Sequence, residues 1–462
     1  MRSKRSSNWS GYVFATLIWA LIVGGTVSAA VIEERALALH PEFFKQFSQA
    51  RKTIWLPAPN APDGEFNLIT RRRYVSGDAV HWSGHRRVKP VVEASLVIGA
   101  NNAIVGALHV EGHHYRIRGN PDDGYVIAAI DPVRRLEPTL DDAESVVDTA
   151  PTRAKSSTSI TRGAFRHPRY TRKFTITKAV DIRDVFRPID MSPDDGSRID
   201  ALFVYTASAA DYFFDIHGVN WRYEFALQSL QVDQILSGSG VSATLNLVHN
   251  EEVNYRASDP ELYDELYDLR DGMIAGVHAL RDAHRADLVI LFVRNNLPTS
   301  GSQINNCGRA FHLDVIAHPG SDPTPDDGRG LYEGRGFAVV DAKCAYHGFT
   351  LAHEIGHTLG AHHDAYALSL TGSSPTPSFA RGMNLPGPDF RTVMAYRDFC
   401  LDVVGRPCAL IPRFSNPLTP YNGFPTGISS GGILDPMDNA LAMNNRRWTV
   451  ANYRNSKFGP FP

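Results

Sequence analysis

The chain contains 462 residues, of which 43% are hydrophobic and 21% are charged, a composition typical of globular proteins. This length predicts two or three domains with cores of ordinary size. The formal net charge of −2 excludes the strong basic excess of many nucleic-acid-binding proteins, so we expect no nucleic-acid partner.

The N-terminus has the pattern of an export signal over residues 1–29. A basic start, MRSKR, precedes an uncharged run and the small residues SAA, which favours cleavage by a signal peptidase after Ala29. The uncharged run from Ser6 to Ile32 is also long enough to span a membrane, so an uncleaved signal anchor is the alternative. We expect a secreted or extracellular protein, with periplasmic or membrane-anchored forms as alternatives. Contact with a membrane is expected only if the segment stays uncleaved.

Residues 30–135 alternate apolar and polar side chains in short runs, separated by turn signals such as GANN and GNPDDG. This pattern predicts a small, β-rich, antiparallel domain. Residues 136–195 are rich in Ser, Thr, Pro and charge, with little apolar periodicity, which predicts an exposed linker. Its basic sites, including Thr171 to Lys173, favour proteolytic removal of the preceding region, so we expect a proenzyme.

Residues 196–456 change to strands that alternate with helices. Apolar runs predict strands within four segments, 198–207, 241–250, 286–293 and 332–341. Helical spacing of apolar residues predicts helices within 218–240 and 260–284. Strands that alternate with long helices predict an α/β fold with a twisted, mainly parallel sheet. Residues 457–462 form a short tail.

The four cysteines are Cys307, Cys344, Cys400 and Cys408. An even number of cysteines in an exported protein predicts disulfides, and four cysteines allow three pairings. Cys400 and Cys408 flank a short loop that they could close locally, which would leave Cys307 to pair with Cys344. A zinc site of the Cys2His2 type fits less well because the chain has no CxxC pair.

The stretch HEIGHTLGAHHD, residues 353–364, concentrates histidines. On a helix, His353 and His357 lie on one face, one turn apart, and two such imidazoles can hold one Zn²⁺. Glu354 is offset from His353 by about 100°. It can therefore reach a water beside the metal and act as the general base.

Gly360 can adopt a left-handed conformation that ends this helix and turns the chain back. We expect His363, three residues later, to return as the third ligand. We interpret His362 as a surface residue or a support for a ligand. Three protein ligands leave a position for water, which is typical of catalytic zinc. The stretch therefore predicts a zinc metalloendopeptidase that hydrolyses proteins or peptides and needs no cofactor beyond the metal.

HEIGHTLGAHHD resembles the extended motif HExxHxxGxxH of the metzincin metalloproteases, and Asp364 after the third histidine resembles the adamalysin/reprolysin branch. The resemblance covers most of residues 197–456, where ALFVYTASA, NNCGRAF and RFSNPLTPYNGFPTG are similar to secreted bacterial reprolysin-like enzymes. It implies an α+β metzincin catalytic domain with a zinc helix. Residues 90–131 are similar to reprolysin propeptides.

The resemblance also implies roles for residues after the motif. Met394 in RTVMAYRDFC matches the methionine turn beneath the zinc. Asp364 and Tyr396 are candidates to support the site. A tyrosine at the offset of Tyr396 approaches the zinc in astacins and serralysins; the alternative is that Tyr396 packs under the site and its hydroxyl bonds elsewhere. The cysteine after NN and the one before the zinc helix appear placed to pair in this group, which supports a Cys307–Cys344 disulfide.

One departure concerns latency. Many animal relatives cap the zinc with a propeptide cysteine, but the first cysteine here is Cys307, inside the expected catalytic region. A cysteine switch from residues 30–135 is therefore impossible. We expect any inhibition to come from covering the cleft or from another ligand.

Two other functions compete with the endopeptidase. One is a non-catalytic binding protein with a metzincin fold, and the other is a zinc hydrolase of another amide bond, such as one in a cell-wall peptide. The presence of Glu354 and of all three ligands favours an enzyme. Calcium has no support, because the acidic segment SDPTPDD lacks EF-hand spacing.

Overall fold

The computed structural model describes residues 31–130, 194–294, 306–313 and 332–456, apart from short gaps at 50, 59–60, 62–63, 373, 376, 385–386, 388 and 432–433. The expected signal segment, nearly all of the linker, the acidic segment SDPTPDD and the tail lie outside the described residues. Among the helices described, none has the length and apolar character needed to cross a bilayer.

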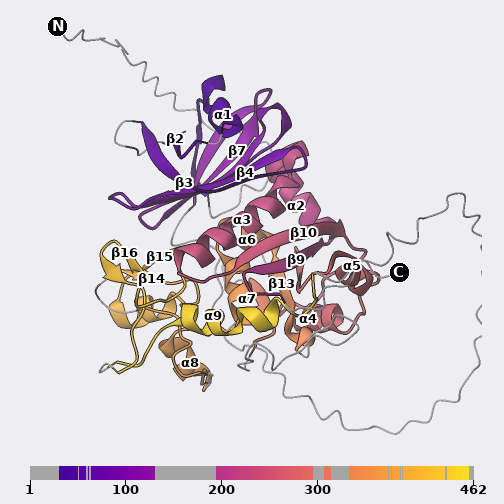
Figure 1. Cartoon of the computed structure of the whole chain (residues 1–462), viewed down its shortest axis with the longest axis vertical. Helices are drawn as coiled ribbons and strands as arrows, with labels where there is room; N and C mark the ends of the chain where they lie inside the picture. Colours follow the sequence, from indigo (N-terminus) through magenta and orange to yellow (C-terminus); the bar gives the residue numbers. More distant parts are fainter. Residues whose placement is uncertain are drawn as a thin grey trace, which may run out of the picture.

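Residues 31–130, here called the N-terminal sheet, form eight antiparallel strands in the order β1-β8-β7-β6-β5-β4-β3-β2. The strands are β1 Val31–Ala36, β2 Thr53–Pro57, β3 Glu65–Ser76, β4 Ala79–Arg86, β5 Val92–Ile98, β6 Ile104–Val110, β7 His113–Asn120 and β8 Gly124–Ile130. Helix α1 (Pro41–Ser48) packs on one face through three phenylalanines, Phe43, Phe44 and Phe47 (Figure 1). The predicted β-rich, antiparallel region is confirmed.

Strand β5 is buried along its whole length, because both faces of the N-terminal sheet are covered there. Leu96 points into the core beneath α1. Val97, the next residue along β5, points to the opposite face and packs against Leu227 of helix α3 (Tyr223–Gly238). Successive strand residues face opposite sides, so the side chains of β5 contribute to two separate hydrophobic cores.

Residues 194–456, here called the C-terminal unit, are built on a five-stranded sheet in the order β10-β9-β11-β13-β12. The strands are β9 Arg198–Tyr205, β10 Thr244–Glu252, β11 Leu288–Val293, β12 Gly308–Ala310 and β13 Phe337–Asp341. All pairs are parallel except β12, which runs antiparallel to β13 at one edge. The predicted α/β fold with a mainly parallel sheet is confirmed.

The C-terminal unit has eight α-helices among its described residues. They are α2 Ala207–His217, α3 Tyr223–Gly238, α4 Tyr263–Arg270, α5 Val277–His284, α6 Ala342–His347, α7 Thr350–Thr358, α8 Ala365–Thr371 and α9 Asn439–Val450. One core joins the sheet to α2, α3, α6, α7 and α9, and a second core joins its other face to α4 and α5. The expected helical region 260–284 is therefore two helices, which Gly272 and Gly276 separate with positive φ.

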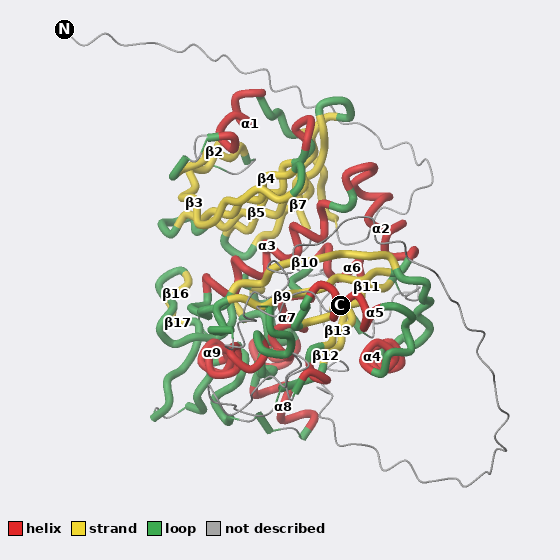
Figure 2. The backbone as a smooth tube through the Cα atoms, turned by 45° about the vertical axis from the view of Figure 1, so that its right-hand side comes forward, coloured by secondary structure: helices red, strands yellow, loops and turns green. Residues whose placement is uncertain are grey.

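Helix α3 lies between the two sheets (Figures 1 and 2). Its residues are buried almost continuously from Glu224 to Leu236. The apolar side packs on the C-terminal sheet, while Gln231, Asp233 and Gln234 on another side meet the N-terminal sheet.

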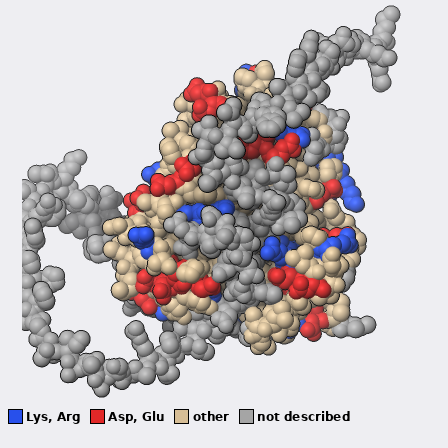
Figure 3. Space-filling view, turned by 180° about the vertical axis from the view of Figure 1, so that it is seen from behind, with Lys and Arg blue, Asp and Glu red and all other residues tan. Residues whose placement is uncertain are grey.

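The face of the molecule in Figure 3 carries both basic and acidic side chains, in keeping with the small net charge.

Candidate metal centre

Helix α7 carries the first two histidines of the motif. Leu351 and Ile355 on α7, with Leu359 just after it, are buried in the main core of the C-terminal unit. The chain turns at Gly360, whose φ is +82° and where a side chain would clash with Arg446. Only glycine combines that conformation with that space, so the predicted turn occurs where the sequence indicated.

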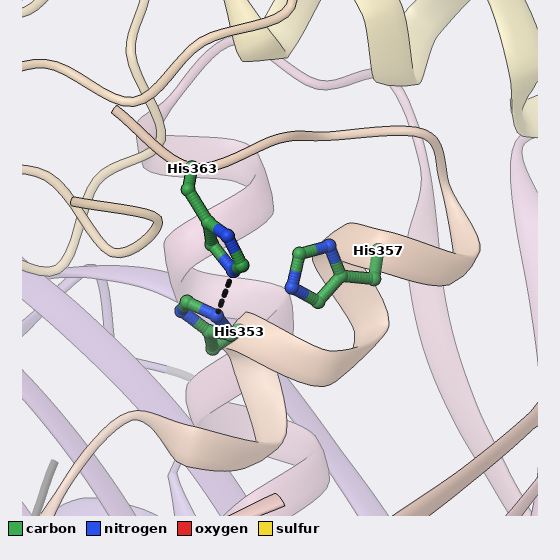
Figure 4. Close-up of side chains that lie close together, drawn as sticks. All are labelled: His353, His357 and His363. Atoms are coloured by element: carbon green, nitrogen blue, oxygen red, sulfur yellow. Dashed lines mark hydrogen bonds between the residues drawn. The ribbon is translucent and has the colours of Figure 1, made fainter. Parts of the chain in front are cut away.

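The turn brings His363 back to His353 and His357 (Figure 4). One ring nitrogen of each histidine lies within 4.8 Å of the others, and Nε2 of His353 is 3.2 Å from Nε2 of His363. All three side chains are buried. Three converging imidazole nitrogens are the donor set that Zn²⁺ accepts in proteins.

Hydrogen bonds orient two of these rings for metal binding. Nδ1 of His353 lies 2.9 Å from the carbonyl oxygen of Val393, and Nδ1 of His357 lies 3.0 Å from that of Ala361. A carbonyl accepts only from a protonated nitrogen, so each Nε2 keeps its lone pair for the site. Burial lowers the pKa of His353 to about 4 and that of His357 well below its usual value. Both rings are therefore neutral, as ligands must be.

Glu354 is also buried and lies against the edge strand β12. A side-chain carbon at Gly308 would lie 2.6 Å from Oε1 of Glu354, so that glycine makes room for the carboxyl group. Burial raises the pKa of Glu354 to about 8, and the positive charge of Arg309 counteracts this effect. A carboxylate with so high a proton affinity can accept a proton from water near neutral pH.

Met394 packs beneath the zinc-motif helix and is fully buried. A side-chain carbon at Gly356, between the two helical histidines, would lie 2.7 Å from the Met394 sulfur. The methionine therefore packs against the turn of α7 that lies between His353 and His357.

Asp364 caps helix α8 and does not join the cluster of three histidines. Its carboxylate accepts hydrogen bonds from the backbone N–H groups of Tyr366 and Ala367, and Oδ2 accepts one from Tyr396 at 2.8 Å. Burial raises its pKa, and these hydrogen bonds oppose the rise. Asp364 thus ties the loop of His363 to the segment after Met394.

The hydroxyl of Tyr396 lies 3.0 Å from Nε2 of His363, at the centre of the site. The Tyr396 ring also stacks near His353, with the centroids 5.8 Å apart. The sequence left open whether this hydroxyl bonds elsewhere, and the structure has it beside a ligand nitrogen.

His362 is buried, so the surface alternative is wrong and a support for a ligand remains the prediction. Its ring lies against His312, with centroids 3.7 Å apart, and its backbone N–H donates to Asn439. Helix α9 covers this position, which sequence spacing alone does not reveal. His312 was missed because it precedes the motif by 41 residues and belongs to no recognisable pattern.

A small pocket opens beside the first ligand. It is lined by Phe349, Thr350, His353, Arg391, Val393, Ala395, Tyr396 and Leu410. Arg391 is buried and donates from Nη1 to the carbonyl oxygen of Ala395 at 2.7 Å. Its guanidinium brings a positive charge to the pocket, and no sequence signal had singled it out.

Both expected disulfides are present. Cys307 bonds to Cys344 and joins the start of the edge strand to α6, while Cys400 bonds to Cys408. The second disulfide closes the loop that precedes the short strand β15 (Ala409–Leu410), which pairs with β14 (Phe390–Arg391). Disulfides persist in oxidising compartments, which supports a location outside the cytoplasm.

Comparison with known proteins shows that part of this chain is similar to a known family. A model described as "Metallo-peptidase family M12B Reprolysin-like" matches residues 229–407. The chain is 29% identical to a peptidyl-Asp metalloendopeptidase of Stenotrophomonas maltophilia over 52% of this chain and 49% of that protein. It is 24% identical to one of Xanthomonas campestris pv. campestris over 83% and 73% of the two chains. The chain thus spans about half the length of the Stenotrophomonas relative.

Among solved structures, metalloproteinase-II from Bacteroides fragilis aligns with 69% of this chain and 84% of its own, at 10% identity and a TM-score of 0.38. The family model covers α3 from residue 229 onward, both helical histidines, His363 and Met394. Residues 229–407 of this chain are therefore similar to the reprolysin-like metallopeptidase family M12B.

Proposed function

We propose that this protein is a secreted zinc metalloendopeptidase with a metzincin catalytic domain. His353, His357 and His363 would hold the zinc, above the methionine turn at Met394. The observation that carries the proposal is the convergence of three buried imidazoles next to a buried carboxyl group. Zinc supplies Lewis acidity, which activates water and polarises a carbonyl group.

In this mechanism Glu354 is the general base. It takes a proton from the attacking water and delivers it to the amine that leaves when the peptide bond breaks. The tight fit against Gly308 holds the carboxylate in place. Because it lies on the same helix as two ligands, its position relative to them is fixed before the substrate arrives.

We further propose that Tyr396 stabilises the transition state. Its hydroxyl is 3.0 Å from Nε2 of His363, so a small rotation can direct the O–H toward a carbonyl oxygen bound at the site. Such a donor contributes on the order of 3 kcal/mol to transition-state stabilisation. Asp364 would act as a positioning residue by holding the backbone of Tyr396.

The relatives' name suggests a preference for aspartate, and Arg391 supplies a physical basis for one. An acidic side chain next to the scissile bond would bind the guanidinium once the pocket that adjoins His353, which holds about 10 Å³, widens around it. We expect a peptide with Asp there to be cleaved about ten to a hundred times more efficiently than the matched Asn peptide. Arg391→Leu should remove this preference, whereas the control Arg397→Gln, outside the pocket lining, should keep it.

The domain division is proposed from the same sequence patterns. Residues 1–29 would be the export signal, 30–135 the prodomain, 136–195 the linker, 196–456 the catalytic domain and 457–462 the tail. N-terminal sequencing of the secreted, active form tests this division. A mature start between about 137 and 190 fits it, and a start before Ala100 or after Ala201 contradicts it.

A casein gel with zinc-loaded protein, with and without chelator, separates the candidate functions. The proposal expects a cleared band that chelator abolishes and that Glu354→Ala lacks. Zinc-loaded protein that clears no protein substrate, but releases amines from a cell-wall peptide, would indicate the other amide hydrolase. Inactivity on both would indicate a binding protein.

A further inference from the structure

The N-terminal sheet contacts the C-terminal unit through a set of charged and amide side chains, here called the docking interface. It comprises Arg71, Arg72, Glu93, Ser95 and Arg116 from the sheet, and Glu224, Gln231, Asp233, Gln234 and Arg413 from the C-terminal unit. Most of these side chains are buried. Polar groups this deep must be paired across the interface, because burial without a partner is costly.

Besides the pair Arg72–Asp233, two buried ion pairs cross the interface, and their polarities are opposite. Arg116 of the sheet binds both carboxylate oxygens of Glu224, and their side chains are 1% and 0% exposed. Arg413 of the C-terminal unit binds Glu93 through two hydrogen bonds of 2.6 Å. Burial opposes ionisation of Glu224, but the charge of Arg116 lowers its pKa to about 2. Each unit therefore presents a cation to the other unit's anion, which fixes one docking register.

The same face is also packed with apolar side chains. Leu227 of α3 inserts among Val97, Val105 and Ala107 of the sheet. Gln234 donates to the carbonyl oxygen of Gly84 and accepts from Ser95. The combination of buried pairs, amide hydrogen bonds and apolar contact is typical of a stable interface core.

The interface continues to the wall of the pocket beside the metal ligands. The backbone oxygen of Arg413 accepts a hydrogen bond from Val393 at 2.8 Å, and Val393 lines that pocket. A side-chain carbon at Gly112 of the sheet would lie 2.6 Å from the Ala409 side chain. The ring of His114 lies edge-on to Phe349, another pocket residue, with centroids 5.5 Å apart. The N-terminal sheet thus supports this wall from behind.

We propose that the N-terminal sheet is a retained partner of the C-terminal unit. A cut in the intervening chain would leave it bound through the docking interface, where it holds the pocket wall in place. This differs from a prodomain that is cut and then lost. The retention itself is independent of catalysis, and only the pocket-wall effect rests on the proposed peptidase activity.

Retention is tested by cutting the folded, full-length chain. A recognition site for a specific protease is inserted between residues 137 and 190, in the Glu354→Ala background to prevent self-cleavage. We expect the two fragments to co-elute at the mass of the uncut chain at micromolar concentration, and to separate only in denaturant. Separation in native buffer would overturn the proposal.

Interface variants sharpen this test. Glu93→Gln leaves the Arg413 charge buried without its anion, so the cut fragments should dissociate at least about a hundredfold more readily. Arg72→Gln, at the more exposed edge of the interface, is the variant to use if Glu93→Gln does not fold. It should increase dissociation of the cut fragments by a smaller factor. The matched control is Glu34→Gln, whose partner Arg118 belongs to the same sheet. Equal behaviour of Glu93→Gln and Glu34→Gln would contradict the role of the interface.

The pocket-wall effect is read from kinetics of the uncut, active chain. Glu93→Gln should raise KM for a peptide about tenfold with little change in kcat, while Glu34→Gln should alter neither. An unchanged KM in Glu93→Gln would overturn the support of the pocket. Inactive wild-type protein that carries zinc would instead contradict the peptidase proposal, and co-elution of the cut fragments would still decide retention.

Discussion

The metal centre and the docking interface are both deeply buried and both polar, yet they are encoded differently. The three histidines and Glu354 come from 11 consecutive residues, whereas Arg116 and Glu224 are 108 positions apart and Glu93 and Arg413 are 320 apart. One helix and one turn set the geometry of the metal centre. The geometry of the docking interface depends on the complete fold. The comparison shows that a buried polar site can be predicted from sequence when local backbone geometry brings its residues together.

The largest effect is expected at the metal centre. Glu354→Ala should lower kcat by about 10⁴-fold, because it removes the general base, while zinc content stays at the wild-type level. Rates measured on a peptide, together with atomic spectroscopy, check both parts. Near wild-type turnover would remove Glu354 from the mechanism.

The neighbouring histidines offer a sharper contrast, because His362 and His363 are adjacent and equally buried. His363→Ala should lose zinc, since it removes one of three ligands. His362→Ala should retain the metal, because its ring lies against His312 instead. Zinc content after dialysis distinguishes them, and the reverse result would make His362 the ligand.

A substitution in the docking interface should change the free energy of unfolding more than it changes catalysis. Arg116→Met leaves the Glu224 carboxylate buried without its main counter-charge and should lower the free energy of unfolding by about 3 kcal/mol. Zinc content should not change. Urea unfolding of the full chain measures this, with Glu34→Gln as the exposed control. A loss below about 1 kcal/mol would mean that the interface is more hydrated than its burial indicates.

The smallest of these effects concerns Tyr396. If its hydroxyl stabilises the transition state, Tyr396→Phe should lower kcat by about a hundredfold with KM little changed. If it only packs against His363, kcat should stay near the wild-type value while zinc remains bound.

Sequence reasoning reached the parts of the site that local geometry controls. The four-residue spacing of His353 and His357 predicted a shared helix face, and Gly360 predicted the turn. The alternation of strands and helices likewise predicted the mainly parallel sheet, because its connections are local.

Other residues enter the site only through long-range contacts, so no spacing rule could identify them. Gly308 reaches Glu354 because β12 pairs antiparallel at the sheet edge. Arg391 reaches the pocket through the pairing of β14 with β15. Helix α3 is buried on all sides because the N-terminal sheet packs against it, and no local sequence pattern predicts that contact.

Titration of metal-free protein with zinc tests the central claim most directly. Hydrolysis of a peptide is followed as zinc is added to the chelated, folded chain. Activity should rise in proportion to zinc and reach its plateau at one zinc per chain, as expected for one catalytic metal on His353, His357 and His363. Protein that binds one zinc per chain and still hydrolyses no peptide would contradict the proposed function.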